Sequence, residues 1–493
     1  MVISPIHYIF VPLATAFLIP LLQKLYKDAA RVVPGLVLFY NLVISVILFR
    51  RVMQHGTVTE IIAGWRPPFG INLMMTPFSA TLASLVSFMA FAVWLYGFRF
   101  KRVLKGGEVM YYEILQLMMI AGALGIILTG DLFNLFVFIE ITGITAISLV
   151  AFYRDRHGAE AGFKYMLLGS LASSFLLLGI LLIYTQTGTL NMAQIAQKMP
   201  AVDSGVKVIA LIFILIALGI EAEMFPLNSW APDAYSQAPS PTSATFASVL
   251  AVAALYALIR VGYTLFDARM ISGFLIVMGF LTMLIAEMAA FSQTDLKRML
   301  AYSSIGQMGL AMVAFGIGNE TAIFGALFLM INHAVIKALL FMSGSYFIYN
   351  LQTKKMDALN GIHKRLPYVS FLFSLGVLAI IGFPPFSGFW SKLYILYGAA
   401  NKNMLLLIIG ILSITLIEMT YYLRVIGRIY FAKEKSEPAS HKPSVNALVA
   451  MTALALVIII LGIYPDLISG YLHQAGRFLL DKQAYIQTVL SMR

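Results

Sequence analysis

Long apolar runs, separated by short polar connectors, constrain the fold of this chain more than any other feature. Each run has about 20 residues, the length that a helix needs to cross the hydrocarbon core of a bilayer. The runs cover residues 3–23, 32–49, 73–97, 110–129, 132–153, 165–185, 208–229, 242–265, 271–292, 299–317, 321–349, 369–397, 404–430 and 444–469. The sequence therefore predicts an all-α polytopic membrane protein with about 14 transmembrane helices.

The composition excludes the common soluble classes of protein. Only 11% of the residues are charged and 60% are hydrophobic, whereas about 25% of the residues of an average soluble chain are charged. The net charge of +12 does not indicate nucleic-acid binding, because the Lys and Arg residues lie in the connectors and do not cluster on one solvated face. We therefore expect the lipid bilayer as a partner, and no nucleic acid.

The chain also lacks the residues of a redox or metal site. It has no cysteine, which excludes thiolate-ligated iron–sulfur clusters, disulfides and Cys-type zinc sites. Its histidines show no metal-ligand spacing, and neither a Walker motif nor a dinucleotide fingerprint is present. The sequence predicts no cofactor, no metal and no catalytic site of its own, so any linked redox chemistry must belong to another subunit.

The basic residues predict the orientation. Connectors after odd-numbered runs hold most of the Lys and Arg residues: Lys24, Lys27, Arg31, Arg99, Lys101, Arg102, Lys105, Arg154, Arg156, Lys164, Lys297, Arg298, Lys354, Lys355, Lys364, Arg365, Arg424, Arg428, Lys433, Lys435 and Lys442. Connectors after even-numbered runs hold fewer: Arg50, Arg51, Arg66, Lys198, Lys207, Arg260, Arg269 and Lys402. The positive-inside rule then places the odd connectors in the cytoplasm and both termini outside the cell membrane.

The two ends of the chain differ in character. The first run lacks a preceding basic segment, so it is expected to be a membrane span and not a cleavable signal. The tail from about residue 470 is mixed in polarity. It could lie as an amphipathic helix at the membrane interface.

Ionisable residues inside the runs are the candidate functional residues. Each costs about 2.5–3.5 kcal/mol to insert at bilayer depth and by default indicates function. They are Glu140, Glu221, Glu223, Glu287, Lys337, Lys392 and Glu418, with His333 beside them. His333 and Lys337 are four residues apart and share one helix face. A line of acids, bases and histidine is what proton movement needs, because each group can accept and release a proton.

Local roles are the alternatives for some of these residues. Glu287 could pair with Arg260 or Lys297, and Glu418 could reach Arg424. One of Glu221 and Glu223 could only satisfy backbone groups near Pro226, and residues two apart cannot face one partner. The predicted proton or ion pathway therefore consists of Glu140, Glu221, Glu223, His333, Lys337 and Lys392.

Prolines should break two of the helices. Pro226 lies in the seventh helix, and Pro384 and Pro385 lie in the twelfth. Because proline removes a backbone donor, such breaks are tolerated at membrane depth only against protein or water, and they indicate an inverted-repeat transporter. We expect three N-terminal helices over 1–109, five-helix repeats over 110–265 (helices 4–8) and 266–430 (helices 9–13), and a last helix with an amphipathic tail over 431–493.

Five segments together resemble a known family. They are TGDLFNLFVFIE (129–140), MFPLNSWAPDAYSQAPSPTSA (224–244), QTDLKRMLAYSSIGQMG (293–309), NHAVIKALLFMSG (332–344) and GFPPFSGFWSK (382–392). They are similar to the antiporter-like subunits of the complex I superfamily, found in NADH dehydrogenase, membrane-bound hydrogenase and sulfur-reducing complexes and Mrp-type Na⁺/H⁺ antiporters. The TGDLFNLFVFIE segment most resembles the D-type subunits of the Mrp antiporters and their relatives in archaeal membrane-bound hydrogenase and sulfur-reducing complexes.

The resemblance implies two inverted five-helix repeats with broken helices 7 and 12 and a polar axis in mid-membrane. It also assigns residues. Glu140 matches the acid of helix five, His333 and Lys337 match the charged segment of helix eleven, and Lys392 matches the lysine of helix twelve.

Two positions depart from the family pattern. Glu221 and Val252 stand where the family has lysines. Glu140 and Glu221 would form a carboxylate pair that shares a proton, since like charges raise a pKa, or that binds Na⁺. The expected function is a proton- or Na⁺-translocating subunit of a complex I-related respiratory or hydrogenase-type complex or of an Mrp antiporter, with other membrane subunits and iron–sulfur redox subunits as partners. The alternative is a non-conducting structural membrane subunit that links a redox module to pumping subunits.

Overall fold

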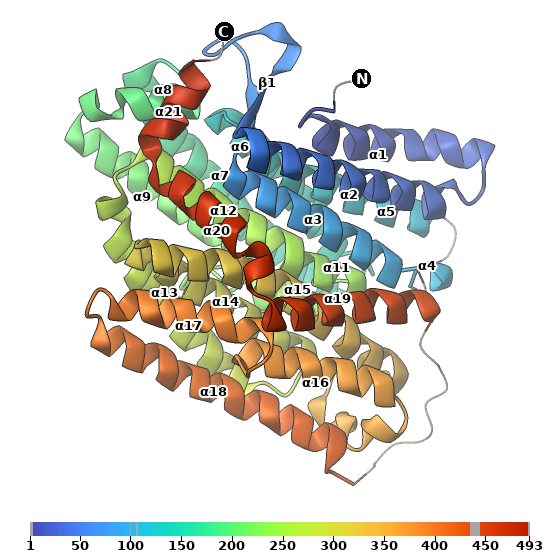
Figure 1. The fold of residues 1–493 in the computed structure, drawn as a ribbon. Helices are drawn as coiled ribbons and strands as arrows, with labels where there is room; N and C mark the ends of the chain where they lie inside the picture. Colours follow the sequence, from blue (N-terminus) through green and yellow to red (C-terminus); the bar gives the residue numbers. More distant parts are fainter. Residues whose placement is uncertain (1–2, 99, 105–106, 434–443, 492–493) are drawn as a thin grey trace.

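The computed structural model describes residues 3–98, 100–104, 107–433 and 444–491. Within these ranges the chain is helical apart from a small hairpin (Figure 1). By length and composition, 13 helices can cross a membrane, and the shorter apolar helix α16 (Pro367–Ile381) accompanies them. The predicted all-α membrane fold is therefore confirmed.

The first helices pack beside the hairpin. They are α1 (His7–Leu25), α2 (Ala29–His55), α3 (Pro77–Tyr96) and the short α4 (Phe100–Val103), with β1 (Val58–Ile61) and β2 (Asn72–Met75) antiparallel between α2 and α3 and a 3₁₀ turn η1 (Ile62–Gly64) after β1. Thr76 fixes the start of α3, because its hydroxyl accepts from the Ser79 amide while Ser79 caps in return and Pro77 stands at the first helical position.

The following helices contain the first break. They are α5 (Glu108–Leu128), α6 (Leu132–Val150), α7 (Arg156–Thr187), α8 (Met192–Lys198), η2 (Met199–Ala201), α9 (Ser204–Glu221), α10 (Ala231–Gln237), α11 (Ser240–Thr245), the π-helical η3 (Phe246–Leu250) and α12 (Ala251–Leu265). Aspartates cap α6, α7 and α9 with their side chains. Residues 222–230, which include Pro226, are not helical. The Trp230 indole satisfies the freed Ile220 carbonyl at 3.2 Å.

The remaining helices contain the second break. They are α13 (Ala268–Ser292), α14 (Leu296–Ile317), α15 (Glu320–Leu351), η4 (Met356–Leu359), η5 (Ile362–Lys364), α16, α17 (Ser387–Ala400), α18 (Leu405–Tyr430), α19 (Val445–Ile463), α20 (Asp466–Leu480) and α21 (Lys482–Leu490). Pro384 and Pro385 lie in the irregular stretch between α16 and α17. Asn332 of α15 donates to the Ser387 carbonyl at 2.9 Å, so the second break also has side-chain support.

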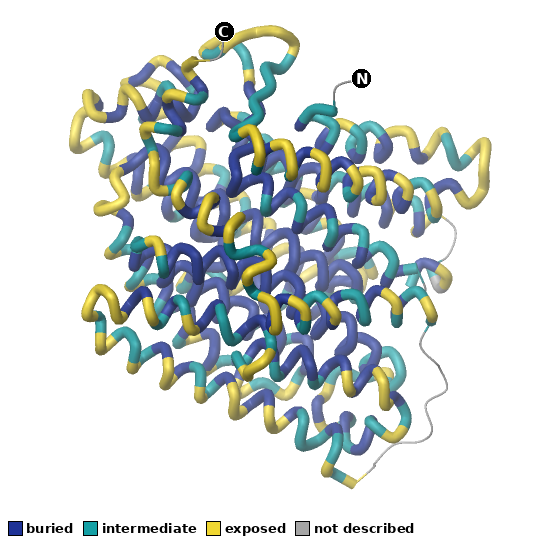
Figure 2. The backbone as a smooth tube through the Cα atoms, in the orientation of Figure 1, coloured by how far each residue is buried: buried dark blue, intermediate teal, exposed yellow. Residues whose placement is uncertain are grey.

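The core lies on the central helices. Every residue of α12 is buried, as are nearly all residues of α14 and α15. Figure 2 shows these buried segments at the centre and exposed positions on the outer helices. A helix that is apolar on all sides is buried on all sides. The charged side chains in the middle of these helices, such as Lys337 on α15, are therefore held away from both lipid and bulk water.

Glycines allow a close crossing of α13 and α14. A Cβ on Gly309 would lie 2.5 Å from the Met283 amide nitrogen, and one on Gly279 would lie 2.7 Å from the Gly309 carbonyl oxygen. Small residues allow such close backbone approach in membrane proteins.

The last predicted run, over 444–469, extends beyond the observed helix α19. The helix ends at Ile463 and not at 469, because Pro465 interrupts it, and α20 and α21 follow. Residues 466–490 pack against α3, α8, α12 and α15 as a strap across the bundle. Both termini lie at the end of the bundle that carries β1 and α8 (Figure 1).

Some basic residues do not lie where the sequence placed them. Arg260 and Lys297 were expected in solvated connectors, but they lie buried in α12 and α14, only 5% and 4% exposed. The helices run further than the apolar runs, because the Asp295 side chain caps α14 two residues before Lys297. Arg99, Lys105, Lys435, Lys442 and Arg493 lie outside the described residues.

Candidate ion-translocation site

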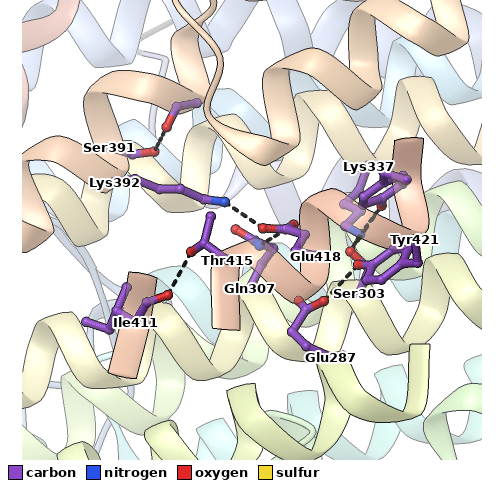
Figure 3. Close-up of polar contacts among 12 residues, drawn as sticks. Glu287, Ser303, Gln307, Lys337, Ser391, Lys392, Ile411, Thr415, Glu418 and Tyr421 are labelled. Atoms are coloured by element: carbon purple, nitrogen blue, oxygen red, sulfur yellow. Dashed lines mark hydrogen bonds and ion pairs between the residues drawn. The ribbon is translucent and has the colours of Figure 1, made fainter. Parts of the chain in front are cut away.

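Five helices of the 266–430 region bring polar side chains together in the membrane interior. We call this group the central polar cluster (Figure 3). It comprises Glu287, Ser303, Gln307, Lys337, Lys392, Glu418, Tyr421 and Tyr422, none more than 8% exposed. They come from α13, α14, α15, α17 and α18, so residues over 130 positions apart in the sequence share one site.

An ion pair lies on one side of the cluster. Lys392 Nζ and Glu418 Oε2 are 2.6 Å apart, and Gln307 donates to the second carboxylate oxygen at 2.8 Å. Lys392 reaches this position because α17 begins after the proline break. The predicted pairing of Glu418 with Arg424 is wrong, because residues six apart lie on different faces of α18.

Lys337 lies at the centre. Its ammonium donates to Ser303 Oγ at 2.6 Å, to Tyr422 OH at 3.1 Å and to the Leu300 carbonyl at 3.3 Å. These partners use all three of its donors. One turn earlier, His333 Nε2 lies 3.1 Å from Ser304 Oγ. His333 Nδ1 is buried and has no hydrogen-bond partner of standard geometry among the described residues.

Glu287 joins the cluster through a tyrosine. Tyr421 OH donates to Glu287 Oε2 at 2.8 Å, while Oε1 is buried without a partner. Gly306 makes room for this carboxylate, since a Cβ there would lie 2.2 Å from Oε1. The predicted pairing of Glu287 with Arg260 or Lys297 is wrong. Arg260 donates to the Ile127 carbonyl and Lys297 to the Ala238 carbonyl, because both lie on other helix surfaces.

Glu223 faces the central helices from the first break. Its Oε1 accepts from Tyr235 OH at 2.6 Å, and the side chain is 1% exposed. The Tyr235 ring stacks on Phe341 of α15 with centroids 5.6 Å apart. Glu223 has a φ of +58°, a conformation that only a few non-glycine residues adopt. This turn separates it from Glu221, so the two acids have different neighbours.

Glu140 and Glu221 lie apart from the central polar cluster. Glu140 is partly exposed on α6 and accepts a hydrogen bond from Ser173 of α7. Glu221 is the last residue of α9 and borders a cavity of about 10 Å³. Its other lining residues are almost all apolar: Ile126, Ile139, Thr142, Leu218, Leu250, Ala254 and Ala257. A water molecule needs roughly 10–15 Å³ and several polar partners, so this cavity is at the lower limit for a single water molecule.

Several members of the site were missed at the level of sequence. Glu287 and Glu418 stood out as buried charges but were given local partners, and Tyr235, Gln307, Tyr421 and Tyr422 were not singled out. Helical spacing carried a signal, because Tyr421 and Tyr422 follow Glu418 by three and four residues. Among the described residues, no three His, Asp or Glu side chains are placed to hold one metal ion.

A family model and several known proteins match this chain. The family model described as NADH:quinone oxidoreductase/Mrp antiporter, TM, matches residues 129–418. An NADH-quinone oxidoreductase subunit of Desulforudis audaxviator is 33% identical, over 94% of this chain and 96% of that protein. A Na⁺/H⁺ antiporter subunit of Alkalihalophilus pseudofirmus is 30% identical, over 98% of each chain.

A solved structure matches along the whole length. A chain of the membrane-bound sulfane sulfur reductase, an archaeal respiratory membrane complex, superimposes with a TM-score of 0.93 at 36% identity, over 99% of this chain and 100% of that one. The resemblance read from the five motifs is thus confirmed. This multi-pass membrane protein belongs to the NADH:quinone oxidoreductase/Mrp antiporter family, the antiporter-like subunits of the complex I superfamily.

Proposed function

We propose that this chain moves protons across the membrane through the central polar cluster. The observation that carries the proposal is the buried set of exchangeable groups between Lys337 and the Lys392–Glu418 ion pair. Hydroxyl, carboxyl and amine groups can each accept and release a proton. Their placement at bilayer depth is costly and is the usual mark of an ion path.

Each charged residue has a distinct task in this path. Lys337 is the central base, and Tyr422 and Ser303 connect it to the tyrosine that binds Glu287. When Glu418 takes up a proton, its ion pair with Lys392 weakens and Lys392 is free to release a proton beyond the second break. Glu223, together with Tyr235, and His333 pass protons to Lys337 from the side of the first break.

The first repeat has a different role in the proposal. The mostly apolar surroundings of Glu221 and the buried Val252 favour a conducting route that leaves out Glu140 and Glu221. The same observation supports the second candidate function, a non-conducting subunit that links other subunits. The intact cluster in the second repeat favours conduction. We propose repeats over 110–265 and 266–430, with both termini outside the cell membrane.

The relatives support an assembly role. Relatives of this chain belong to an NADH-quinone oxidoreductase, a Na⁺/H⁺ antiporter and a respiratory sulfur reductase. We propose that this chain likewise works with other membrane subunits, driven by redox subunits or by an opposing Na⁺ gradient.

Replacing Lys392 tests the function. The purified complex that contains the chain is reconstituted in liposomes with an enclosed pH indicator, with and without Na⁺. Lys392→Ala should abolish proton transport while the subunits still copurify. Lys402→Ala, an exposed lysine ten residues further on, is the matched control and should transport normally. Normal transport by the assembled Lys392→Ala complex would refute the role of the cluster and leave the linking function.

A further inference from the structure

A large cavity lies at the end of the bundle that carries α4. Its volume is about 920 Å³, and it is lined, among others, by Phe100, Phe152, Tyr153 and Pro241. We call it the vestibule. Tyr111 and Tyr153 on its lining are 56% and 52% exposed, so the vestibule opens to the surface. Water and protons can therefore reach its inner wall.

Behind this wall lies an ion pair that the central polar cluster does not use. Lys101 Nζ and Glu113 Oε1 are 2.8 Å apart, and their side chains are only 2% and 3% exposed. Lys101 also lies over the Trp94 ring at 4.5 Å. The sequence placed Lys101 in a solvated connector, and the structure buries it. A buried ion pair is poor evidence of added stability, since desolvation offsets the attraction.

A tyrosine separates the vestibule from this ion pair. The Tyr112 ring packs edge-on against Phe100 at 5.2 Å and Phe152 at 5.5 Å, and both of these rings line the vestibule. On the other side of Tyr112 is a cavity of about 20 Å³ that Lys101 and Glu113 line. This is enough space for one water molecule among polar groups.

Polar side chains continue from this small cavity toward α14. Gln116, which also lines it, donates to Tyr112 OH and to Thr242 Oγ1, each at 2.8 Å. The next residue along α11, Ser243, accepts from Lys297 Nζ at 3.1 Å. No carboxylate among the described residues forms an ion pair with Lys297.

The same helix then leads to the central polar cluster. Lys297 and Ser303 are six residues apart on α14, about 9 Å along the helix axis. The Leu300 carbonyl and Ser303 Oγ both accept from Lys337. Buried polar groups thus extend from Lys101 and Glu113 to the centre of the molecule.

We propose that the Lys101–Glu113 pair is a proton-loading site that takes protons from the vestibule and delivers them through Thr242, Ser243 and Lys297 to Lys337. This inference rests on the proposed function, because it gives the cluster an inlet. The inlet lies in the part of the chain where the expected lysines are missing at Glu221 and Val252.

The transfer conserves protons and needs no other reactant. A proton from vestibule water forms an O–H bond on Glu113, which breaks the ion pair with Lys101. Glu113 then passes the proton to a water molecule in the small cavity that Glu113 and Gln116 line, and the Thr242 hydroxyl, which accepts from Gln116, takes it up and gives its own proton on toward Ser243. Once Lys337 has passed its own proton on, Lys297 releases an N–H proton toward Lys337, and Lys297 is reprotonated from the Ser243 side. Lys101 stays an ammonium during this step; burial lowers its pKa, and the charge of Glu113 opposes that shift.

Three variants of the intact complex in liposomes test this site. Glu113→Gln and the double variant Lys101→Met with Glu113→Leu should each lower proton transport by about 100-fold or more, the usual contribution of a proton-transferring group. The swapped pair, Lys101→Glu with Glu113→Lys, keeps two titratable groups and should retain most of the rate. The exposed pair Arg31–Asp28, replaced by Met and Leu, is the control and should transport normally.

The double variant separates loading from a structural role. An apolar replacement of a buried ion pair is often neutral or stabilising, so a purely structural pair would allow normal transport by the Met and Leu variant. That result would overturn the proposal even if Glu113→Gln misfolds. If Lys392→Ala abolishes transport and the double variant does not, only the loading site fails. If the wild-type complex moves no protons, the proposed function fails as well.

Discussion

Lys392 and Glu418 show how two full charges persist in the interior of a membrane protein. The ammonium and the carboxylate neutralise each other, and Gln307 satisfies the second carboxylate oxygen. Removing one partner leaves the other charge buried without compensation. Removing both takes away the charge and the desolvation cost together. A variant that removes one charge should therefore lose stability, whereas a variant that removes both should not.

Unfolding of the purified chain measures this difference. We expect Lys392→Met alone to lower the free energy of unfolding by about 3–5 kcal/mol, whereas Lys392→Met with Glu418→Leu should restore it to near the wild-type value. Thermal unfolding in detergent, followed by circular dichroism, gives the comparison. Equal stability of the single and double variants would mean that the two charges do not interact.

The residues of the site divide into those that sequence could predict and those that it could not. Lys337, His333, Lys392 and Glu223 are charged or ionisable residues in apolar runs, so their cost at bilayer depth singles them out. Their partners Tyr235 and Tyr422 carry no charge, so they do not stand out in an apolar run in the same way. Only packing of helices far apart in sequence shows which hydroxyl meets which charge.

At the scale of elements, the crossing of α13 and α14 positions Glu287 against α18. Gly279 and Gly309 face each other there without room for a side chain. Any added atom must push the two helices apart, and Glu287 moves with α13. The crossing is thus both a packing contact and part of the geometry of the site.

Gly309→Ala tests the crossing. The new Cβ would lie 2.5 Å from the Met283 nitrogen, and overpacking of this kind costs about 1–3 kcal/mol. Gly169→Ala on α7, where nothing lies within 4 Å, should instead stabilise by about 0.5–1 kcal/mol through helix propensity. Unfolding midpoints of the two variants give the comparison, and a shift of the same sign in both would contradict this account.

The elements themselves were largely predictable. Apolar runs of membrane-spanning length and the prolines at 226, 384 and 385 gave the helices and both breaks. The helix boundaries were less predictable than the helices, because a capping residue such as Asp295 starts a helix before its apolar run begins. The position of the strap helices α20 and α21 could not be predicted from the sequence, since a segment of mixed polarity fits either the membrane interface or the surface of other helices.

At the scale of the whole molecule, the absence of cysteine makes the orientation directly testable. The chain has 0 cysteines, so a single introduced cysteine reports its own position. Ser491→Cys at the strap end and Lys433→Cys after α18 are both exposed positions in the wild type. On intact cells, a membrane-impermeant maleimide should label the first and not the second. Labelling of Lys433→Cys alone would reverse the orientation predicted from the basic residues.

The strap should also dock more firmly at higher pH. Burial lowers the pKa of Lys482 below its ordinary value of 10.5. The negative charge of Asp267 opposes this shift, and the positive charge of Lys207 adds to it. An undocked strap therefore binds more protons than a docked one, so docking strengthens as the pH rises toward 10.5 and weakens as it falls. Hydrogen-exchange protection of α21, compared with an unstructured peptide at each pH, measures this slope. Lys482→Gln should remove most of it.

The strap has a mechanical consequence for transport. α20 contacts α3, α12 and α15, and α21 contacts α8, so one continuous segment holds surfaces from both ends of the sequence together. Many membrane carriers work by rocking one half of the molecule against the other around a central substrate. In this protein such rocking would have to break the contacts of α20 or α21 with one of these helices in every cycle. In the transport proposed above, ions therefore cross a frame that stays still, by shifts of side chains and water.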